Sequence, residues 1–237
     1  MAILSTIGFD ADDTLWHNER FFRLTQERFT KLLRDHAAPE DLSERLLAAE
    51  RRNLGRYGFG IKGFVLSMIE IATEVSGDQV PADTLRAILE AGREMLAHPV
   101  DLLPGAEAAI RALHGHYRLV LITKGDLLDQ ERKLAESGLG DWFDAVEIVS
   151  DKTPHVYTRI FSTHGDGAER ALMAGNSMKS DVRPAIQAGA HGVFVPHGEI
   201  WALEAAPPPR DTDRFHEIAN LRDLPDLVRR LDARFGG

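Results

Sequence analysis

Cysteine is absent from this chain of 237 residues, which excludes disulfides and thiolate chemistry. No apolar run approaches the roughly 18 residues that a membrane-spanning helix needs. The N-terminus also lacks a basic stretch followed by an apolar signal core. From these absences we expect a cytoplasmic protein with no membrane partner.

Positive charge is in short supply as well. The chain has 28 Lys and Arg against 37 Asp and Glu, which gives a formal net charge of −9. An acidic surface disfavours general binding to nucleic acids or to anionic membranes. A small anionic substrate remains compatible with this charge, because a single site can be locally positive. The sequence has no signature of oligomeric state.

The apolar pattern changes twice along the chain. Residues 3–9 form a short, β-branched run that predicts a buried strand, and residues 18–96 show only helical spacing. Strands and helices then alternate. The predicted strands of this last part are residues 117–123, 143–150, 170–176, 192–198 and 214–220.

Such alternation predicts an α/β fold with a Rossmann-like, doubly wound parallel sheet. The helical block interrupts it after the first strand. We therefore predict a core domain of residues 1–16 and 98–237 and an inserted all-helical cap domain of residues 17–97. Two tandem domains fit less well, because the first strand would be separated from its sheet.

Polar side chains follow several predicted strands, and ligands of open α/β sheets bind at these strand ends. The first strand runs into three aspartates whose repulsion requires a compensating cation or hydrogen bonds. Together the strand ends offer carboxylate, hydroxyl, ammonium and amide groups, which suit phosphoryl transfer with Mg²⁺. The groups concerned are Asp10, Asp12, Thr123, Lys152, Asn176 and Asp181.

Four motifs in a fixed order carry a family resemblance. They are "DADDTL", "LIT", a lysine before "TP", and "GNSMKSD". The set resembles the haloacid dehalogenase-like hydrolase superfamily, in its phosphatase branch with a helical cap after the first strand. The resemblance covers essentially the whole chain, and the ordered set is far more specific than any single motif.

The resemblance implies a role for each matching residue. Asp10 matches the nucleophile that becomes an aspartyl-phosphate, and Asp12 matches the general acid/base. Lys152 matches the lysine that bridges phosphate and nucleophile, while Thr123 and Lys124 occupy the phosphate-binding motif. The implied Mg²⁺ ligands are Asp10, Asp12 through its backbone carbonyl, Asn176 and Asp181. The implied substrate is a small phosphorylated metabolite.

Two positions depart from the family pattern. Asn176 stands where members commonly carry Asp, so we expect Asp181 to supply the compensating charge to the metal, directly or through water. Lys124 stands where Asn is frequent, and its contact with phosphate could be made by the backbone N–H.

The same groups leave other functions open. A phosphomutase would use the same residues, and a 2-haloacid dehalogenase would use Asp10 to attack carbon, although Asp12 argues for phosphate. A catalytically silent binding relative is a further alternative in view of Asn176. A receiver-type signalling module is disfavoured, because such modules lack an inserted helical block.

Other features are interpreted as structural. Asp13 is predicted to be a turn or cap residue and Trp16 a packing residue. The histidines show no convincing metal-ligand spacing. The glycine-rich segment 55–64 predicts a loop between two helices, in which Tyr57, Phe59 or Lys62 could reach a substrate.

Overall fold

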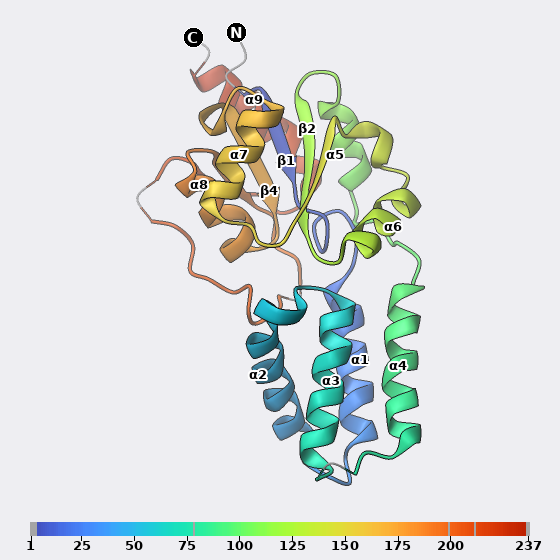
Figure 1. The fold of residues 1–237 in the computed structure, drawn as a ribbon. Helices are drawn as coiled ribbons and strands as arrows, with labels where there is room; N and C mark the ends of the chain where they lie inside the picture. Colours follow the sequence, from blue (N-terminus) through green and yellow to red (C-terminus); the bar gives the residue numbers. More distant parts are fainter. Residues whose placement is uncertain (1–3, 78, 199, 211, 236–237) are drawn as a thin grey trace. The chain divides into compact units, whose positions relative to one another are not determined.

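The computed structural model describes residues 4–77, 79–198, 200–210 and 212–235, and the chain forms two compact units. The sheet unit comprises Met1–Glu19, Val100–Lys124 and Gln130–Gly237. The helical unit comprises Arg20–Pro99 and Gly125–Asp129. The sheet unit is therefore assembled from segments on both sides of a long helical insertion (Figure 1).

Six described strands form one parallel sheet in the order β3-β2-β1-β4-β5-β6. Each strand overlaps a range predicted from the sequence, including the short last one, and the doubly wound parallel sheet is confirmed. Their bounds are β1 Thr6–Phe9, β2 Arg118–Lys124, β3 Ala145–Val149, β4 Ala171–Gly175, β5 His191–Phe194 and β6 Phe215–Glu217.

The strand order reverses between β1 and β4, which pair with each other in parallel. At such a switch point the connections leave towards opposite faces, so a crevice forms at the carboxyl ends of the strands. Asp10 lies there directly after β1, and its backbone N–H donates to the carbonyl of Ala174 in β4 at 2.9 Å. The topology therefore positions the aspartate motif at the expected binding edge.

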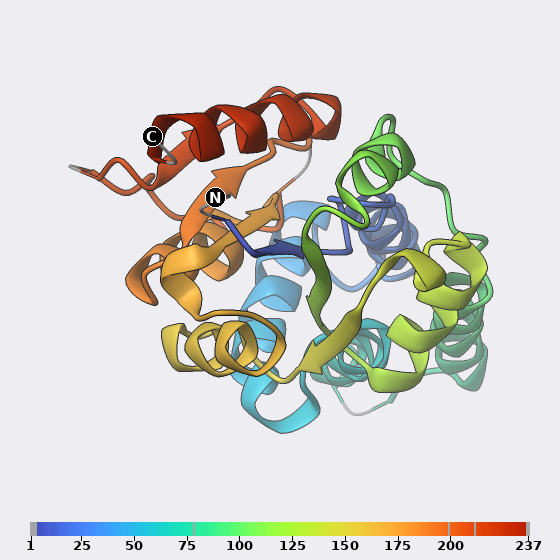
Figure 2. The same ribbon diagram turned by 90° about the horizontal axis from the view of Figure 1, so that it is seen from above.

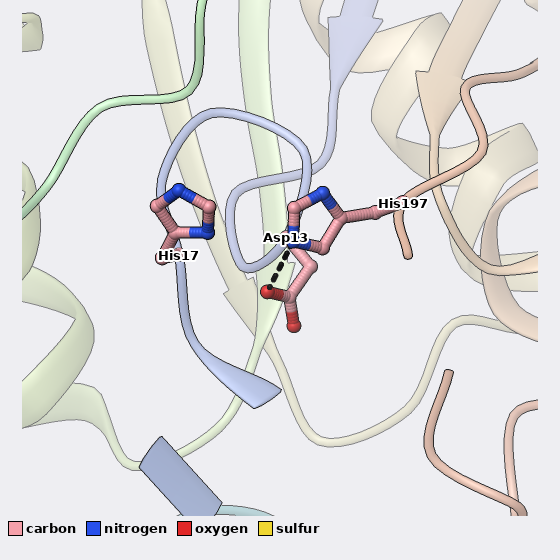
Figure 3. Close-up of side chains that lie close together, drawn as sticks. All are labelled: Asp13, His17 and His197. Atoms are coloured by element: carbon pink, nitrogen blue, oxygen red, sulfur yellow. Dashed lines mark ion pairs between the residues drawn. The ribbon is translucent and has the colours of Figure 1, made fainter. Parts of the chain in front are cut away.

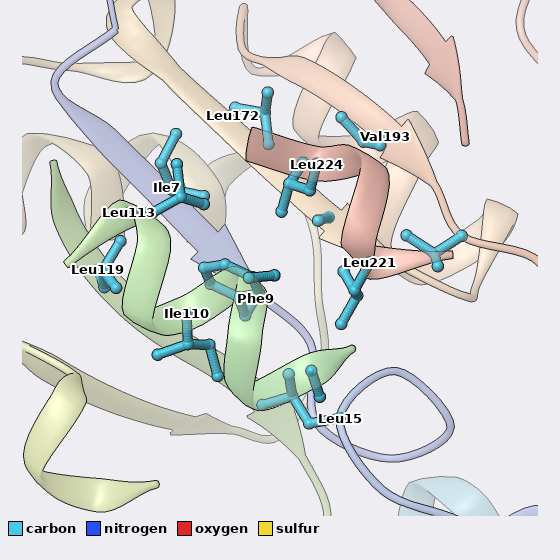
Figure 4. Close-up of a cluster of buried hydrophobic side chains, with 14 of the residues drawn as sticks. Ile7, Phe9, Leu15, Ile110, Leu113, Leu119, Leu172, Val193, Leu221 and Leu224 are labelled. Atoms are coloured by element: carbon cyan, nitrogen blue, oxygen red, sulfur yellow. The ribbon is translucent and has the colours of Figure 1, made fainter. Parts of the chain in front are cut away.

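Helices cover both faces of the sheet (Figure 2). Alternate residues of β1 point to opposite faces, so Ile7 and Phe9 join a core that includes residues of α5 (Ala106–Leu113) and α9 (Leu224–Phe235) (Figure 4). A second core lies between the sheet and α7 (Pro154–His164) with α8 (Arg183–Gln187). The helix α6 (Leu127–Ser137) follows β2. These cores fix the strands whose ends carry the polar groups.

The helical unit has its own apolar core, contributed by four helices. Their bounds are α1 Glu19–Leu32, α2 Pro39–Tyr57, α3 Ile61–Val75 and α4 Ala82–Leu96. The glycine-rich loop is only three residues long, since α2 extends to Tyr57 and α3 begins at Ile61. Gly58 and Gly60 both have positive φ, which explains glycine at these positions. The cap bounds proposed above, 17–97, stay a prediction.

Two side chains of this loop region are engaged within the helical unit. The Tyr57 hydroxyl donates to Glu70 at 2.8 Å, and Lys62 pairs with Asp126 at 2.9 Å. Contact of either residue with a substrate stays a prediction. Among the described residues, no helix combines the length and apolar character required to cross a membrane.

The buried His191, which lies beside the half-buried His216, should make stability depend on pH. His191 Nδ1 lies 3.0 Å from His216 Nε2, and burial, then the neighbouring His216, lower the pKa of His191 to about 4. The unfolded side chain titrates near 6.5. Between these values the unfolded chain binds more protons, so the free energy of unfolding falls as the pH falls. We expect a loss of about 2–3 kcal/mol from pH 7 to pH 4 from this group.

Urea unfolding across this pH range checks the effect in wild type and in His191→Gln. The variant should show a shallower dependence on pH, whereas His155→Gln, at an exposed position of α7, should behave as wild type. Equal slopes in His191→Gln and wild type would contradict this assignment.

Candidate active site

A buried ammonium lies between two buried carboxylates at the carboxyl ends of the central strands. Lys152 Nζ donates to Asp10 Oδ1 at 2.5 Å and to Asp181 Oδ1 at 2.7 Å. All three residues are at most 6% exposed. Asp10 follows β1, Lys152 precedes α7, and Asp181 follows β4, so three separate connections of the sheet meet here.

When both carboxyls are ionised, two negative charges face a single positive charge. Burial opposes the charge of Lys152, but Asp10 and Asp181 outweigh burial and raise the pKa of Lys152. Burial and the Asp10 charge raise the pKa of Asp181 to about 7, although Lys152 acts in the opposite direction. Ionisation of the second carboxyl is therefore disfavoured at this position, and an additional cation would favour it.

Thr14 connects Asp10 to the loop after β4. Its hydroxyl donates to Asp10 Oδ2 at 2.9 Å and accepts the backbone N–H of Asn176 at 3.1 Å. The amide oxygen Oδ1 of Asn176 lies 3.4 Å from the same hydroxyl. Asn176 is therefore a neighbour of the Asp10 carboxylate, as its place in the motif predicts.

The loop after β4 is shaped to present Asp181. Ser177 accepts the N–H of Ser180 with its hydroxyl, and it begins a wide π-helical turn, Met178–Val182. Such turns often occur at functional sites. Asp181 Oδ2 accepts the backbone N–H of Ser177 at 2.8 Å, which holds the carboxylate back over the strand end. Ser177 and Ser180 therefore shape the start of this turn.

Gly175, the last residue of β4, permits this arrangement. A Cβ atom at this position would overlap the Asp181 carboxylate. Only glycine leaves room for the carboxylate against the backbone, so Gly175 positions Asp181 without contacting it through a side chain.

Lys124 does not have an open ammonium in this arrangement. Its Nζ donates to Glu204 Oε1 at 2.6 Å and to Ser180 Oγ at 2.8 Å. Glu204 also accepts the Ser177 hydroxyl at 2.5 Å. Burial raises the pKa of Glu204, but Lys124 and its hydrogen bonds outweigh burial and lower it. A contact of Lys124 with an anion through its backbone N–H is compatible with this network.

Asp12 is held by a separate set of donors. Its Oδ1 accepts the Trp16 indole N–H at 2.8 Å and Lys133 Nζ at 3.0 Å, and its Oδ2 accepts Gln130 Nε2 at 2.8 Å. Burial would raise the pKa of Asp12, but Lys133 and these hydrogen bonds lower it below its usual range. Asp12 is therefore fixed as an ionised carboxylate in this state.

Asp13 is a cap residue, as predicted. It has a φ of 58°, and its two carboxylate oxygens each accept a backbone N–H at 2.9 Å, from Asn18 and from Glu19 at the start of α1. Burial first, and then the charges of Asp12 and Asp10, raise the pKa of Asp13 to about 7. The three aspartates of the motif therefore point into three different environments.

The structure thus brings four of the predicted residues together at the carboxyl ends of the strands: Asp10, Lys152, Asn176 and Asp181. Thr123 lies buried near the end of β2, the strand that pairs with β1 on its other side. Sequence reasoning missed Thr14, Gly175 and Glu204, together with the two α6 residues that bind Asp12. Thr14 lay inside the quoted motif, and Gln130 and Lys133 share one helical face at a spacing of three. No local signal identified Glu204.

The donor set at this edge fits a hard divalent cation. Carboxylate oxygens of Asp10 and Asp181 and the amide oxygen of Asn176 are ligands of the type that Mg²⁺ prefers. The local surplus of negative charge points the same way. Their roles in binding a metal stay predictions.

Comparisons with known proteins identify the relatives of this chain. The family of haloacid dehalogenase-like hydrolases matches residues 4–189. A crystal structure of a haloacid dehalogenase-like family hydrolase from Xanthomonas campestris is 40% identical, with a TM-score of 0.88 over 99% of this chain and 94% of that one. A 2-haloacid dehalogenase from Pseudomonas syringae is 20% identical with a TM-score of 0.62, over 96% of this chain and 99% of the other, which shows similarity of fold alone.

Two relatives named for phosphatase or nucleotidase activity have lower sequence identity than the Xanthomonas protein. A glyceraldehyde 3-phosphate phosphatase from Methanopyrus kandleri is 24% identical over 97% of this chain and 99% of its own length. The pyrimidine 5'-nucleotidase YjjG from Escherichia coli is 26% identical over 50% of this chain and 56% of its own.

Gly175 gives a test of this geometry that needs no substrate. Gly175→Ala should displace the Asp181 carboxylate and lower the free energy of unfolding by about 1–3 kcal/mol, because the site is tightly packed. Gly55→Ala is the control. Gly55 lies on α2, and a Cβ atom at this position would meet nothing within 4 Å. This substitution should leave stability unchanged or raise it by roughly 0.5–1 kcal/mol. Urea unfolding measures both, and equal stability of Gly175→Ala and wild type would refute the close approach.

Proposed function

This chain belongs to the haloacid dehalogenase-like hydrolase family, and we propose that it is a Mg²⁺-dependent phosphomonoester hydrolase that forms an aspartyl-phosphate on Asp10. The observation that carries the proposal is the Lys152 bridge between two buried carboxylates at the switch point of the sheet. A buried lysine of fixed charge can hold a phosphate beside a carboxylate that would otherwise repel it.

The proposed reaction has two steps. A carboxylate oxygen of Asp10 attacks phosphorus, the bond from phosphorus to the leaving oxygen breaks, and Asp12 gives a proton to the departing alkoxide. Water then gives a proton to Asp12 and attacks the same phosphorus. The bond to Asp10 breaks, which releases inorganic phosphate and restores the carboxylate.

The remaining side chains support these steps. Lys152 binds a phosphate oxygen while it orients Asp10, and Thr123 with the backbone N–H of Lys124 binds the other phosphate oxygens. The Thr14 hydroxyl donates to the second carboxylate oxygen of Asp10, and this hydrogen bond fixes the orientation of the carboxylate. Asp10, Asp181, Asn176 and the backbone carbonyl of Asp12 would hold Mg²⁺, which supplies positive charge for the phosphate and the carboxylates.

The environment of Asp12 fits one half of its proposed role directly. As an ionised carboxylate beside Lys133, it suits the step that takes a proton from water. Proton donation to the leaving group requires the protonated form, and therefore a weaker hold by Lys133 and Gln130. We propose that these two residues position Asp12 and set the balance between its two states.

Small phosphorylated metabolites are the substrate class that we propose. Distant relatives named as phosphatases of glyceraldehyde 3-phosphate and as a pyrimidine nucleotidase support a small phosphomonoester. A 2-haloacid dehalogenase is the weaker candidate, because the second acid Asp12 has no evident use in attack on carbon. A phosphomutase shares every group named here and differs in how water is excluded.

Activity with and without metal tests this proposal. Purified chain should hydrolyse at least one phosphomonoester in a metabolite screen with Mg²⁺, and EDTA should abolish the turnover. Asp10→Asn should remove activity, and Asp12→Asn should lower kcat by about 10²–10⁴-fold, since it loses a positioned acid/base. Asp141→Asn, at an exposed position, is the matched control.

Two outcomes would count against the proposal. One is absence of turnover with every phosphomonoester while the chain is folded by circular dichroism. The other is activity that persists in EDTA or in Asp10→Asn.

Asn176 gives a separate prediction about metal affinity. Asn176→Asp should lower the Mg²⁺ concentration needed for half-maximal activity, because it adds a charge to the ligand set. Asn176→Ala should raise that concentration at least about tenfold, since it removes an oxygen ligand. The measurement is a Mg²⁺ titration of kcat at saturating substrate. If all three proteins share one Mg²⁺ midpoint, Asn176 is not a ligand.

A further inference from the structure

A second group of ligand-type side chains surrounds the cap residue Asp13. His197 Nε2 lies 3.5 Å from Asp13 Oδ1, and the ring centroids of His17 and His197 are 5.2 Å apart. One ligand atom from each of the three residues lies within 4.8 Å of the other two. Figure 3 shows both imidazole rings beside the Asp13 carboxylate. Distance along the sequence hid this group, because His197 follows β5.

One atom of this group lacks a partner. Nδ1 of His17 is buried and makes no hydrogen bond to any residue that the structure describes. A buried polar atom left unsatisfied costs about 1–3 kcal/mol. The hydrogen bonds of Asp13 to α1 and the contact with His197 leave this nitrogen unexplained, whereas a bound ion would satisfy it.

We propose that Asp13, His17 and His197 form a binding site for Zn²⁺ or a similar late first-row transition-metal ion. Two imidazoles and one carboxylate are a donor set of this class, with an open position for water. Mg²⁺ is a poor match, because it prefers oxygen ligands. Asp13 can ligate while it caps α1, since its two oxygens offer about four lone-pair sites and use two of them.

The site requires a modest contraction. Bonds of about 2.0–2.1 Å in a tetrahedral site place ligand atoms roughly 3.3 Å apart. The pair formed by Asp13 and His197 is already near this separation at 3.5 Å. His17 would complete it by a side-chain movement that closes the remaining separation, since the three ligand atoms already lie within 4.8 Å of one another.

This site is separate from the proposed Mg²⁺ site, although both begin in the loop after β1. It uses Asp13, whereas the proposed Mg²⁺ ligands are Asp10, Asn176, Asp181 and a backbone carbonyl. A bound ion would join the loop after β1, the residues that lead into α1, and the segment after β5. Because it binds the folded chain, it should also raise the unfolding temperature.

Metal titration of the full chain in excess Mg²⁺ tests the proposal. Excess Mg²⁺ occupies oxygen-ligand sites, so added Zn²⁺, measured by competition with a chromophoric chelator, reports nitrogen-containing sites. We expect one equivalent bound, a raised unfolding temperature, and visible Co²⁺ absorption of tetrahedral strength. Nitrogen-15 spectra of the histidine rings should show Zn²⁺-dependent shifts at two imidazoles.

Matched variants locate the site. His17→Gln and His197→Gln should each lower Zn²⁺ affinity at least about tenfold. His155→Gln should bind as wild type, and so should Asp10→Asn, because neither changes a proposed ligand. Since Asp10→Asn should also remove phosphatase activity, the Zn²⁺ site and the proposed function can fail independently.

Three results would overturn the inference. The first is wild type that binds no Zn²⁺ in excess Mg²⁺. The second is binding that survives in His17→Gln and His197→Gln, or that is lost in Asp10→Asn while circular dichroism shows that this variant is folded. The third, which needs no variant, is Zn²⁺ binding to wild type without shifts at two histidine rings.

Discussion

The pairing of Lys152 with Asp10 and Asp181 is the interaction on which the site depends. Two carboxylates buried at the carboxyl ends of neighbouring strands repel each other, and a single ammonium compensates the charge of only one of them. Removal of one partner from such a buried group typically costs about 3–5 kcal/mol. The same imbalance leaves the site short of positive charge. The surplus negative charge, which is unfavourable in the folded state, therefore favours binding of a cation. A bound cation would in turn favour an anionic substrate.

The surrounding structure serves to hold this charge arrangement still. The reversal of strand order between β1 and β4 brings their two loops together. Thr14 then bridges Asp10 to the loop after β4, and Gly175 leaves space for the Asp181 carboxylate. Asp12 and Asp13, only two and three positions away, are held by other partners. Three adjacent carboxylates thus have three surroundings, and only one of them shares the buried lysine.

The sequence predicted the sheet and the main groups well, because both follow local rules. A β-branched run predicts a strand, and polar residues at strand ends meet once the strands are parallel. Glu204, Lys133 and His197 could not be found in this way. Each reaches a partner 27 or more positions away in the sequence, so only the folded chain reveals the contact. The histidines illustrate this most clearly, since His17 and His197 have no local metal spacing and nevertheless lie side by side.

In the proposed reaction Asp10, and no other carboxylate of this site, carries the phosphoryl group. Rapid quenching during hydrolysis of a phosphomonoester, followed by borohydride reduction and peptide mass spectrometry, tests it directly. Reduction converts an acyl phosphate on aspartate to homoserine. We expect homoserine at position 10 only when substrate is present. Homoserine at position 12 or 181, or none at any position during demonstrated turnover, would contradict it.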